Sequence, residues 1–585
     1  MHPKLTDQPR GAFTFVLHGH LPYVLAHGTW PHGSDMLFEC AAESYLPLLQ
    51  TFDRLARDGV SAKVTMGLTP VLAEQLADPD FKHQFSDYLQ LRARSAAENR
   101  DQFQKQRQHH FADLADMWHK HFVAVRTAFH DHYHSDLVAA FRRLQDDGHI
   151  EIISSCATHG YLPLLGSDES VQAQVKQAVR SHQRHFGRPP RGFWLPECGY
   201  RPRYAWASPL AGAGPQEPVL RKGVEEFLAE NGIEYFIVDT ATLMGGAAMG
   251  VYLERFAGLQ DLWERSRASY RPGPVDVDKS PYEAYLVSSA NEDRPPVSVF
   301  TRDERTGVQV WSGEHGYPGD GWYLDFHKKH FPGGHRYWRV TSSSSDLGSK
   351  EPYEPHRAAE RVPENADHFC DVVHEILTQH NDSRETYGIV CAPYDAELFG
   401  HWWFEGPEWL YRVLKGVDAN PAVDLVTCSE YLDRHTPAAA VALPESSWGQ
   451  GGFHWIWLND WTTWIWEHIY AAEAEFPALA QQALDSQDAA LAEIVTQAAR
   501  ELLLLEASDW PFLISTWSAR DYAERRAGLH HEAFARLADM ARRRAAGADL
   551  REEDRQFLAD CRERDSLFPD LDLAWWARLE SMPRS

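Results

Sequence analysis

Short apolar runs that each end at a polar or acidic residue recur along the first three quarters of the chain. They cover residues 13–17, 62–66, 150–153, 193–195, 235–238, 297–300, 388–391 and 424–426. Amphipathic stretches with helical spacing, such as 44–58 and 357–381, lie between most of these runs. The alternation predicts an α/β fold of repeated βα units, a parallel barrel whose functional residues stand at the carboxyl ends of the strands.

Two segments interrupt this alternation. Residues 79–134 are rich in Gln, His, Arg and Phe at helical spacing, which predicts a helical insertion between the second and third strands. Residues 245–296 carry Gly, Pro, Tyr and mixed charges, and a long irregular connection inside a compact domain is usually a functional lid or a disordered excursion. We expect the second segment to form a mobile loop over the active site.

Helical patterns replace strand patterns from about residue 429 onward. They cover residues 462–472, 477–483, 488–508, 519–544 and 552–564. The Gly- and Trp-rich stretch 446–459 comes before them and is expected to be a loop that roofs the cleft. The predicted organisation is a catalytic domain over 1–428, interrupted by the insertion 79–134, and a helical domain over 429–585 that completes the cleft.

The composition narrows the possible partners. A balance of 57 Lys+Arg against 84 Asp+Glu gives a formal charge of −27, which disfavours nucleic acid and anionic membrane surfaces. The 21 tryptophans and 12% aromatic residues favour carbohydrate binding, with unusually Trp-rich packing as the alternative.

The cysteines and the N-terminus indicate the compartment. Seven scattered cysteines without a CxxC pair argue against a disulfide framework or a zinc ribbon. The N-terminal residues lack the order of a secretory signal, and no later run approaches the length of a membrane span. A cytoplasmic location is therefore predicted.

Two acidic residues follow strand-like runs among aromatic side chains. Glu197 lies in Trp-Leu-Pro-Glu-Cys-Gly-Tyr, and Asp395 follows Tyr394 in Tyr-Asp-Ala-Glu-Leu-Phe-Gly-His-Trp-Trp. The structural alternatives are a helix-capping or salt-bridging role for Glu197 and an N-cap role for Asp395. Two carboxyl groups that face each other across an aromatic trough are typical of glycosidases, and retaining enzymes place them about 5–5.5 Å apart.

Histidines form a second candidate group. His18 and His20 lie on the same side of an extended strand end, and His159 and His401 could complete a set of metal ligands. The rival interpretation is hydrogen bonding to sugar hydroxyls. We favour the second because no acidic residue lies beside the first pair in the sequence, so no metal or other cofactor is predicted.

The order of these motifs resembles glycoside hydrolase family 57 and, within it, the 1,4-α-glucan branching enzymes. The matching segments span nearly the whole chain: HGHLPY at 18, GHIEIISSCATHGYLPLL at 148, FWLPECGYRP at 193, VWSGEHGYPGDGWYLDFHKK at 310, YDAELFGHWWFEGPEWL at 394, SSWGQGGFHWIWLN at 446 and ASDWPFLI at 507. The resemblance implies a distorted (β/α)7 barrel with a helical insertion and a C-terminal α-helical domain.

The resemblance also implies the roles of individual residues. Glu197 is implied as the nucleophile and Asp395 as the general acid/base. Substrate contacts are implied for His18, His20, Trp30, His159, Trp311, His401, Trp402, Trp448 and Trp457, and more weakly for Asp460 and Asp509. A loop tyrosine that favours transfer over hydrolysis is expected within 245–296, with Tyr270, Tyr282 and Tyr285 as candidates.

The expected function is cleavage of an α-1,4-glucan and transfer of the chain to a 6-hydroxyl by a retaining double displacement, which forms α-1,6 branches. A family 57 α-amylase or 4-α-glucanotransferase is the alternative within the family. A metal-dependent polysaccharide deacetylase and a non-catalytic glucan-binding protein are the alternatives from other classes. The oligomeric state stays open.

Overall fold

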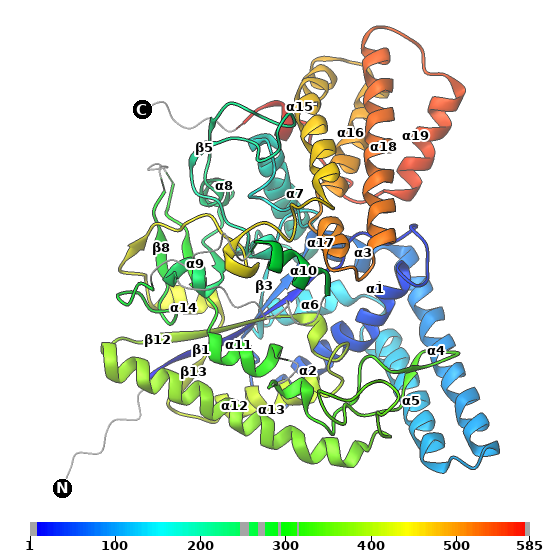
Figure 1. Ribbon diagram of the computed structural model, residues 1–585, viewed down its shortest axis with the longest axis vertical. Helices are drawn as coiled ribbons and strands as arrows, with labels where there is room; N and C mark the ends of the chain where they lie inside the picture. The colour runs from blue at the N-terminus through cyan, green and yellow to red at the C-terminus, as the bar shows by residue number, and fades with distance from the viewer. Residues whose placement is uncertain (1–8, 246–256, 267–274, 290–293, 313–314, 580–585) are drawn as a thin grey trace.

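Parallel strands form the centre of the molecule (Figure 1). The computed structural model describes residues 9–245, 257–266, 275–289, 294–312 and 315–579. One sheet has the order β12 (Gly388–Asp395), β1 (Gly11–Gly19), β2 (Val64–Leu68) and β3 (Ile150–Ile153), and β13 (Val423–Leu425) pairs with the start of β1. Every residue of β1 is buried, as expected for a strand covered on both faces.

A second sheet lies beside the first. Its order is β14 (Ala440–Val441), β8 (Tyr285–Val287), β9 (Ser298–Thr301), β7 (Tyr235–Val238) and β4 (Gly192–Trp194). Isolated parallel bridges join Ser154 to Phe193 and Arg302 to Cys391, so the second sheet is linked to the first through β3 and β4 and again through β9 and β12. The carboxyl ends of β1, β2, β3, β4, β7, β9 and β12 therefore point toward a common rim, whereas β8 and β14 run in the opposite direction.

The predicted strands agree with this arrangement, since each apolar run overlaps β1, β2, β3, β4, β7, β9, β12 or β13. The pattern missed β8, β14 and the antiparallel pair β5 (Tyr204–Trp206) and β6 (Val219–Arg221), which are too short for periodicity to detect. The expectation of an irregular loop over 245–296 is wrong for β8, which pairs with β9, and for α10 (Ala257–Ser266). Residues 246–256, 267–274 and 290–293 lie outside the described residues.

Helices cover the strands. They are α1 (Ser34–Cys40), α2 (Leu46–Arg57), α3 (Pro70–Ala77), α4 (Pro79–Lys105), α5 (His109–Thr127), α6 (Leu137–Asp146), α7 (Asp168–Phe186), α8 (Val224–Glu230), α9 (Thr240–Met244), α11 (Glu304–Trp311), α12 (Pro355–Arg384), α13 (Gly406–Asp418) and α14 (Cys428–Arg434). α4 and α5 account for the helical segment expected over 79–134, and they project from the molecule as a pair (Figure 1). Phe15 of β1 stacks on Phe369 of α12, which in turn contacts Trp409 of α13, so part of the core lies between the first sheet and these helices.

The last part of the chain is helical: α15 (Thr463–Asp485), α16 (Ala489–Leu505), α17 (Asp509–Ser515), α18 (Arg520–Ala545), α19 (Glu552–Arg564) and α20 (Ala574–Ala577). The two helices expected over 462–472 and 477–483 are one helix, α15, which continues through Pro477. Its buried Phe476 packs against Phe534 of α18 and Trp576 of α20, and this packing outweighs the helix-breaking tendency of proline. Short α17 lies between these long helices and the strands (Figure 1).

Among the described residues, no helix combines the length and the apolar character that crossing a bilayer requires.

Candidate active site

Glu197 stands on a sharp turn that follows strand β4. The turn Pro196–Cys198 places Glu197 at φ +59° and Cys198 at φ +51°. Non-glycine residues rarely adopt the left-handed region, and such strain concentrates at functional sites. The turn keeps the Glu197 side chain at the rim, where it is 15% exposed.

Both carboxyl oxygens of Glu197 accept hydrogen bonds from distant parts of the chain. The indole Nε1 of Trp448 donates to Oε2 at 2.7 Å, and the hydroxyl of Ser508 donates to Oε1 at 2.9 Å. Burial raises the pKa of Glu197 to about 7, although both donors and His20 act to lower it. The group therefore changes its charge near neutral pH.

Asp395 ends strand β12 next to β1. Its register partner is His18, the penultimate residue of β1. Burial raises the pKa of the Cys198 thiol, and the charges of Glu197 and Asp395 both raise it further. The two carboxyl groups, remote in the sequence, thus lie within electrostatic reach of one thiol at the same rim.

Three of the four predicted histidines come together beside Glu197. Nε2 of His18 lies 3.1 Å from Nε2 of His159, and the ring of His20 stacks on that of His159 at 3.9 Å. The ring of His18 also stacks on Trp194 at 4.7 Å. Burial, with the charge of His20 next, lowers the pKa of His18 and of His159 well below the usual value, so both rings are neutral.

An acidic residue lies beside the histidine pair in space, although none lies beside it in the sequence. Asp509 at the start of α17 lies 3.1 Å from Nε2 of His20, so an acidic partner is present although it is remote in the sequence. Burial alone would lower the pKa of His20, but Asp509, Glu397 and Glu197 raise it above its usual value. Ligand atoms of His20, His159 and Asp509 are close enough to share a metal ion.

The hydrogen bonds present at these residues use the same atoms that would bind a metal. His20 has Thr69 at Nδ1 and Asp509 at Nε2, and His159 has Ser508 at Nδ1 and His18 at Nε2. In this arrangement each ring nitrogen of His20 and His159 is therefore satisfied by a neighbouring side chain.

His401 does not join the other three histidines. Its Nδ1 pairs with Glu43 at 2.9 Å, and Arg336 holds both the carboxylate of Glu43 and the backbone carbonyl of His401. Burial acts to raise the pKa of Glu43, but Arg336 and His401 lower it below its usual range. A direct sugar contact by His401 stays a prediction.

The predicted tryptophans occupy different environments. Trp448 contacts Glu197, whereas Trp30 is 71% exposed in the loop that follows β1. Trp457 is fully buried, stacks on Tyr161 at 4.3 Å and meets Trp448 edge to face at 5.2 Å. The ring of Trp457 therefore has no exposed face and supports Trp448. A direct substrate contact by Trp457 stays a prediction.

Two more tryptophans pack at the end of β12. Trp311 at the end of α11 is buried. The centre of its ring lies 6.3 Å from that of the partly buried Trp402, and Trp311 also contacts Tyr394. Trp311 therefore packs against Tyr394, the residue that precedes Asp395.

The remaining candidates, two aspartates and three tyrosines, lie in different environments. Asp509 belongs to the histidine cluster, whereas Asp460 is exposed on the loop before α15. Tyr282 donates to Asp303 at 2.7 Å, and Tyr285 is buried in β8, so both are held within the fold. Tyr270 lies outside the described residues.

Several site residues were not expected from the sequence. Ser508 bridges His159 and Glu197, and its backbone N–H donates to the carbonyl of His159. Glu397 accepts from the backbone of His20 and from the hydroxyl of Tyr45. Ser508 and Glu397 lie inside the ASDW and YDAE motifs, and the motifs are the signal that could have identified them.

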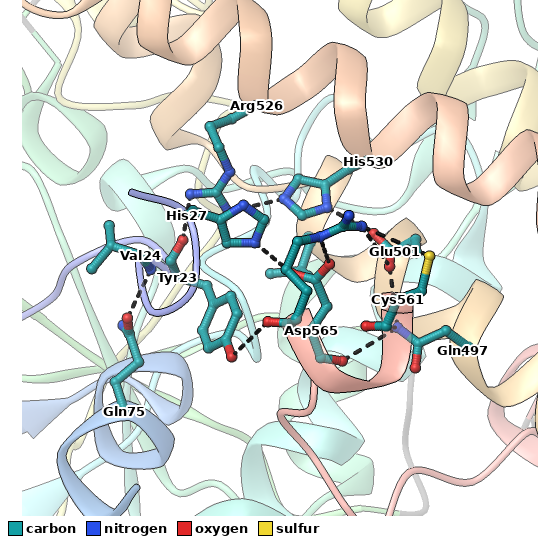
Figure 2. Close-up of polar contacts among 12 residues, drawn as sticks. Tyr23, Val24, His27, Gln75, Gln497, Glu501, Arg526, His530, Cys561 and Asp565 are labelled. Carbon is teal, nitrogen blue, oxygen red and sulfur yellow. Dashed lines mark hydrogen bonds and ion pairs between the residues drawn. The ribbon is translucent and has the colours of Figure 1, made fainter. Parts of the chain in front are cut away.

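Figure 2 shows a second cluster of two histidines and an aspartate, which consists of His27, His530 and Asp565. His27 of the loop after β1 pairs with Asp565 at 2.6 Å, and His530 of α18 pairs with Glu501 of α16 at 2.8 Å. Arg526 donates to His530, and Arg564 pairs with Asp565. With two guanidinium groups inside the network, the cluster is a buried ionic connection between the N-terminal loop and the C-terminal helices, not a cation site.

The chain belongs to glycosyl hydrolase family 57, whose profile matches residues 14–444. A second profile, that of the C-terminal region of 1,4-alpha-glucan branching enzymes, matches residues 468–576.

Two branching enzymes are similar in sequence to this chain over nearly its whole length. The 1,4-alpha-glucan branching enzyme of Thermococcus kodakarensis is 40% identical over 566 residues, which cover 96% of this chain and 77% of that protein. A probable 1,4-alpha-glucan branching enzyme of Mycobacterium tuberculosis is 31% identical over 96% of this chain and 97% of its own length.

Solved structures extend the similarity to the fold. The crystal structure of the Thermococcus branching enzyme superposes with a TM-score of 0.87 at 39% identity over 98% of both chains. The α-amylase AmyC of Thermotoga maritima superposes with a TM-score of 0.78 at 28% identity over 97% of this chain and 99% of its own.

Proposed function

We propose that the protein is a 1,4-α-glucan branching enzyme that acts by a retaining double displacement. The observation that carries the proposal is the environment of Glu197, whose two oxygens are each held by a donor at the rim of the parallel strands. The similarity to two branching enzymes over nearly the whole chain, and the match to a branching-enzyme C-terminal region, support the substrate and the reaction.

In the proposed first step, Glu197 attacks the anomeric carbon of an α-1,4-linked glucose and Asp395 protonates the departing oxygen. A glucosyl ester of Glu197 results. In the second step a 6-hydroxyl of another glucan attacks the ester while Asp395 removes its proton, so the bond to Glu197 breaks and an α-1,6 branch forms with net retention. Water is the competing acceptor.

The electrostatics of the site set the pH range in which Glu197 can act as the nucleophile. A nucleophile must be ionised, and a carboxyl group with a pKa of about 7 is substantially ionised only from neutral pH upward. We therefore expect kcat/KM to fall on the acidic side of about pH 7 in the free enzyme.

Amylose distinguishes the proposed reaction from its rivals. After incubation, branches released by isoamylase are counted against new reducing ends, so transfer and hydrolysis are measured in one sample. We expect branches to dominate. Reducing ends without branches would make the protein an amylase, as the similarity to AmyC allows. Redistributed linear chains would indicate a 4-α-glucanotransferase, and an unchanged glucan would leave a binding protein or a deacetylase.

The roles of the two carboxyl groups are separated by rescue with azide. In Glu197→Ala, azide attacks the anomeric carbon directly and gives the inverted glycosyl azide. In Asp395→Ala, azide replaces the second acceptor and gives the retained product. The opposite stereochemistry would exchange the two assignments.

The finer architecture belongs to the same proposal. We propose a distorted (β/α)7 barrel made of β1, β2, β3, β4, β7, β9 and β12, supported by their continuous parallel pairing and the two bridges between the sheets. Within it we propose a catalytic domain over 1–428, interrupted by the insertion 79–134, and a helical domain over 429–585.

A cytoplasmic location is also proposed, because all seven cysteines are free thiols, which suits a reducing compartment.

A further inference from the structure

An unbroken chain of hydrogen bonds leads from Glu197 into the interior. Oε1 of Glu197 lies 2.9 Å from the hydroxyl of Ser508, which lies 2.8 Å from Nδ1 of His159. Nε2 of His159 lies 3.1 Å from Nε2 of His18. The chain ends there, because Nδ1 of His18 is buried without a hydrogen-bond partner.

The protons can be assigned along this chain. A carboxylate only accepts, so the single proton of Ser508 points to ionised Glu197 and the Ser508 oxygen must accept from Nδ1–H of His159. Neutral His159 then has a bare Nε2, which accepts from Nε2–H of His18. Neutral His18 is left with a bare Nδ1, which matches the partnerless atom.

The reverse direction is less favourable. It would need a protonated Glu197 that donates to Ser508, and it would leave an N–H at Nδ1 of His18 buried without an acceptor. Orphaned donors are rarer in folded proteins than incompletely satisfied acceptors. The unpaired position on His18 therefore favours the direction that ends on an ionised Glu197.

We propose that Ser508 is a positioning residue for Glu197, oriented by His159 and His18 so that its only proton is committed to the ionised carboxylate. The proposal rests on the function proposed for Glu197, and it assigns a part of the C-terminal helical segment to the ionisation of the nucleophile. The other titratable groups that face Glu197 are His20, His159, Tyr161, Cys198 and Asp509, with Asp395 at the same rim.

The test is the pH profile of kcat/KM on amylose for Ser508→Ala and Ser508→Thr. The alanine variant loses a donor to the charged form, so the acidic limb should move to higher pH by about one unit, with a loss of about tenfold at pH 6 and a small loss at pH 9. The threonine variant keeps the hydroxyl and should keep the limb of the wild type. A merely structural role would lower the rate at every pH without moving the limb.

Ser508→Cys supplies a weak donor and should give a smaller shift in the same direction, so it replaces the alanine variant if that variant does not fold. An acidic limb at the wild-type pH in the alanine or cysteine variant overturns the proposal.

If the wild type leaves amylose unchanged, the proposed function fails. The hydrogen-bond chain from Glu197 to His18 is then tested separately. Carboxyl titration of Glu197 by infrared difference spectroscopy, with Glu197→Gln as the blank, should show the same upward shift in Ser508→Ala. An unchanged titration overturns the proposal.

Discussion

Two clusters of this molecule have the same composition, two histidines and one aspartate, but different surroundings and different expected roles. His20, His159 and Asp509 lie beside Glu197, whereas His27, His530 and Asp565 lie among the C-terminal helices. In the first cluster the neighbours are a hydroxyl, an indole and two carboxyl groups at a rim. In the second, Arg526 is hydrogen-bonded to His530, and Arg564 forms an ion pair with Asp565.

The neighbours decide the chemistry. A site that binds a polar ligand needs donors and acceptors at an accessible rim, and Asp509 keeps 13% of its side chain exposed. Asp565 and His530 have no exposed surface, and each already pairs with a buried side chain, His27 and Glu501 respectively. The first cluster is therefore expected to control activity and the second to control stability.

The largest effect is expected at Glu197. Glu197→Gln should lower the rate of glucan processing by about 10⁴-fold or more, because an amide cannot form the ester, with little change in melting temperature. Glu225→Gln is the matched control, since burial also raises the pKa of Glu225 to about 7. Glu225 lies in α8 and accepts a hydrogen bond from the hydroxyl of Tyr200. Substantial turnover in Glu197→Gln would remove Glu197 from the reaction.

Asp565→Asn should lower stability and leave activity unchanged, which is the reverse of the result expected for Glu197→Gln. It leaves Arg564 and His27 without their buried anion, so the free energy of unfolding by urea should fall by about 3–5 kcal/mol while kcat per folded molecule is kept. Burial opposes ionisation, but His27 and Arg564 lower the pKa of Asp565, so its stabilisation is present above the unfolded pKa and is lost as pH falls toward the folded pKa.

The exposed Asp549, which pairs with Arg544, is the control, and Asp549→Asn should unfold like the wild type. Equal stability of Asp565→Asn and the wild type at pH 7 would show that the second cluster is not a structural connection.

Asp509→Asn should lower the free energy of unfolding by less than Asp565→Asn, and the size of the loss should depend on pH. The folded pKa of His20 is raised, so its stabilisation is complete below the unfolded pKa and is lost as pH rises through the folded pKa. The variant should be less stable than the wild type by about 1–3 kcal/mol at pH 5 and by less at pH 9. A loss that is the same at both pH values in thermal unfolding would contradict the ion pair.

The smallest effect is expected from chelation. Because the ring nitrogens of His20 and His159 are engaged in hydrogen bonds and arginines enter the second cluster, EDTA should change neither activity nor melting temperature. Activity that is lost to EDTA and restored by Zn²⁺ would favour the deacetylase alternative.

The sequence could predict that several candidate residues lie at one rim because its motifs are local. Glu197, Asp395 and the pair His18 and His20 each follow an apolar run, and the carboxyl ends of parallel strands meet at one rim. The same reasoning could not predict that Trp457 is buried, since a Gly- and Trp-rich stretch does not reveal which ring is exposed and which is buried.

Pairings between remote residues lay beyond local patterns. The partner of His20 is Asp509, nearly five hundred residues away, and no spacing rule connects them. For the same reason the sequence does not reveal that His401 pairs with Glu43 and lies apart from the other three histidines.

By itself the sequence determined the parallel strands, the helical segments and the identity of the two acidic residues, because periodicity and short motifs act over a few neighbouring positions. Only the tertiary structure decided which of two equivalent His–His–Asp sets stands beside Glu197 and which is neutralised by arginines. That choice depends on side chains brought together by the packing of α16, α17 and α18 against the loop that follows β1.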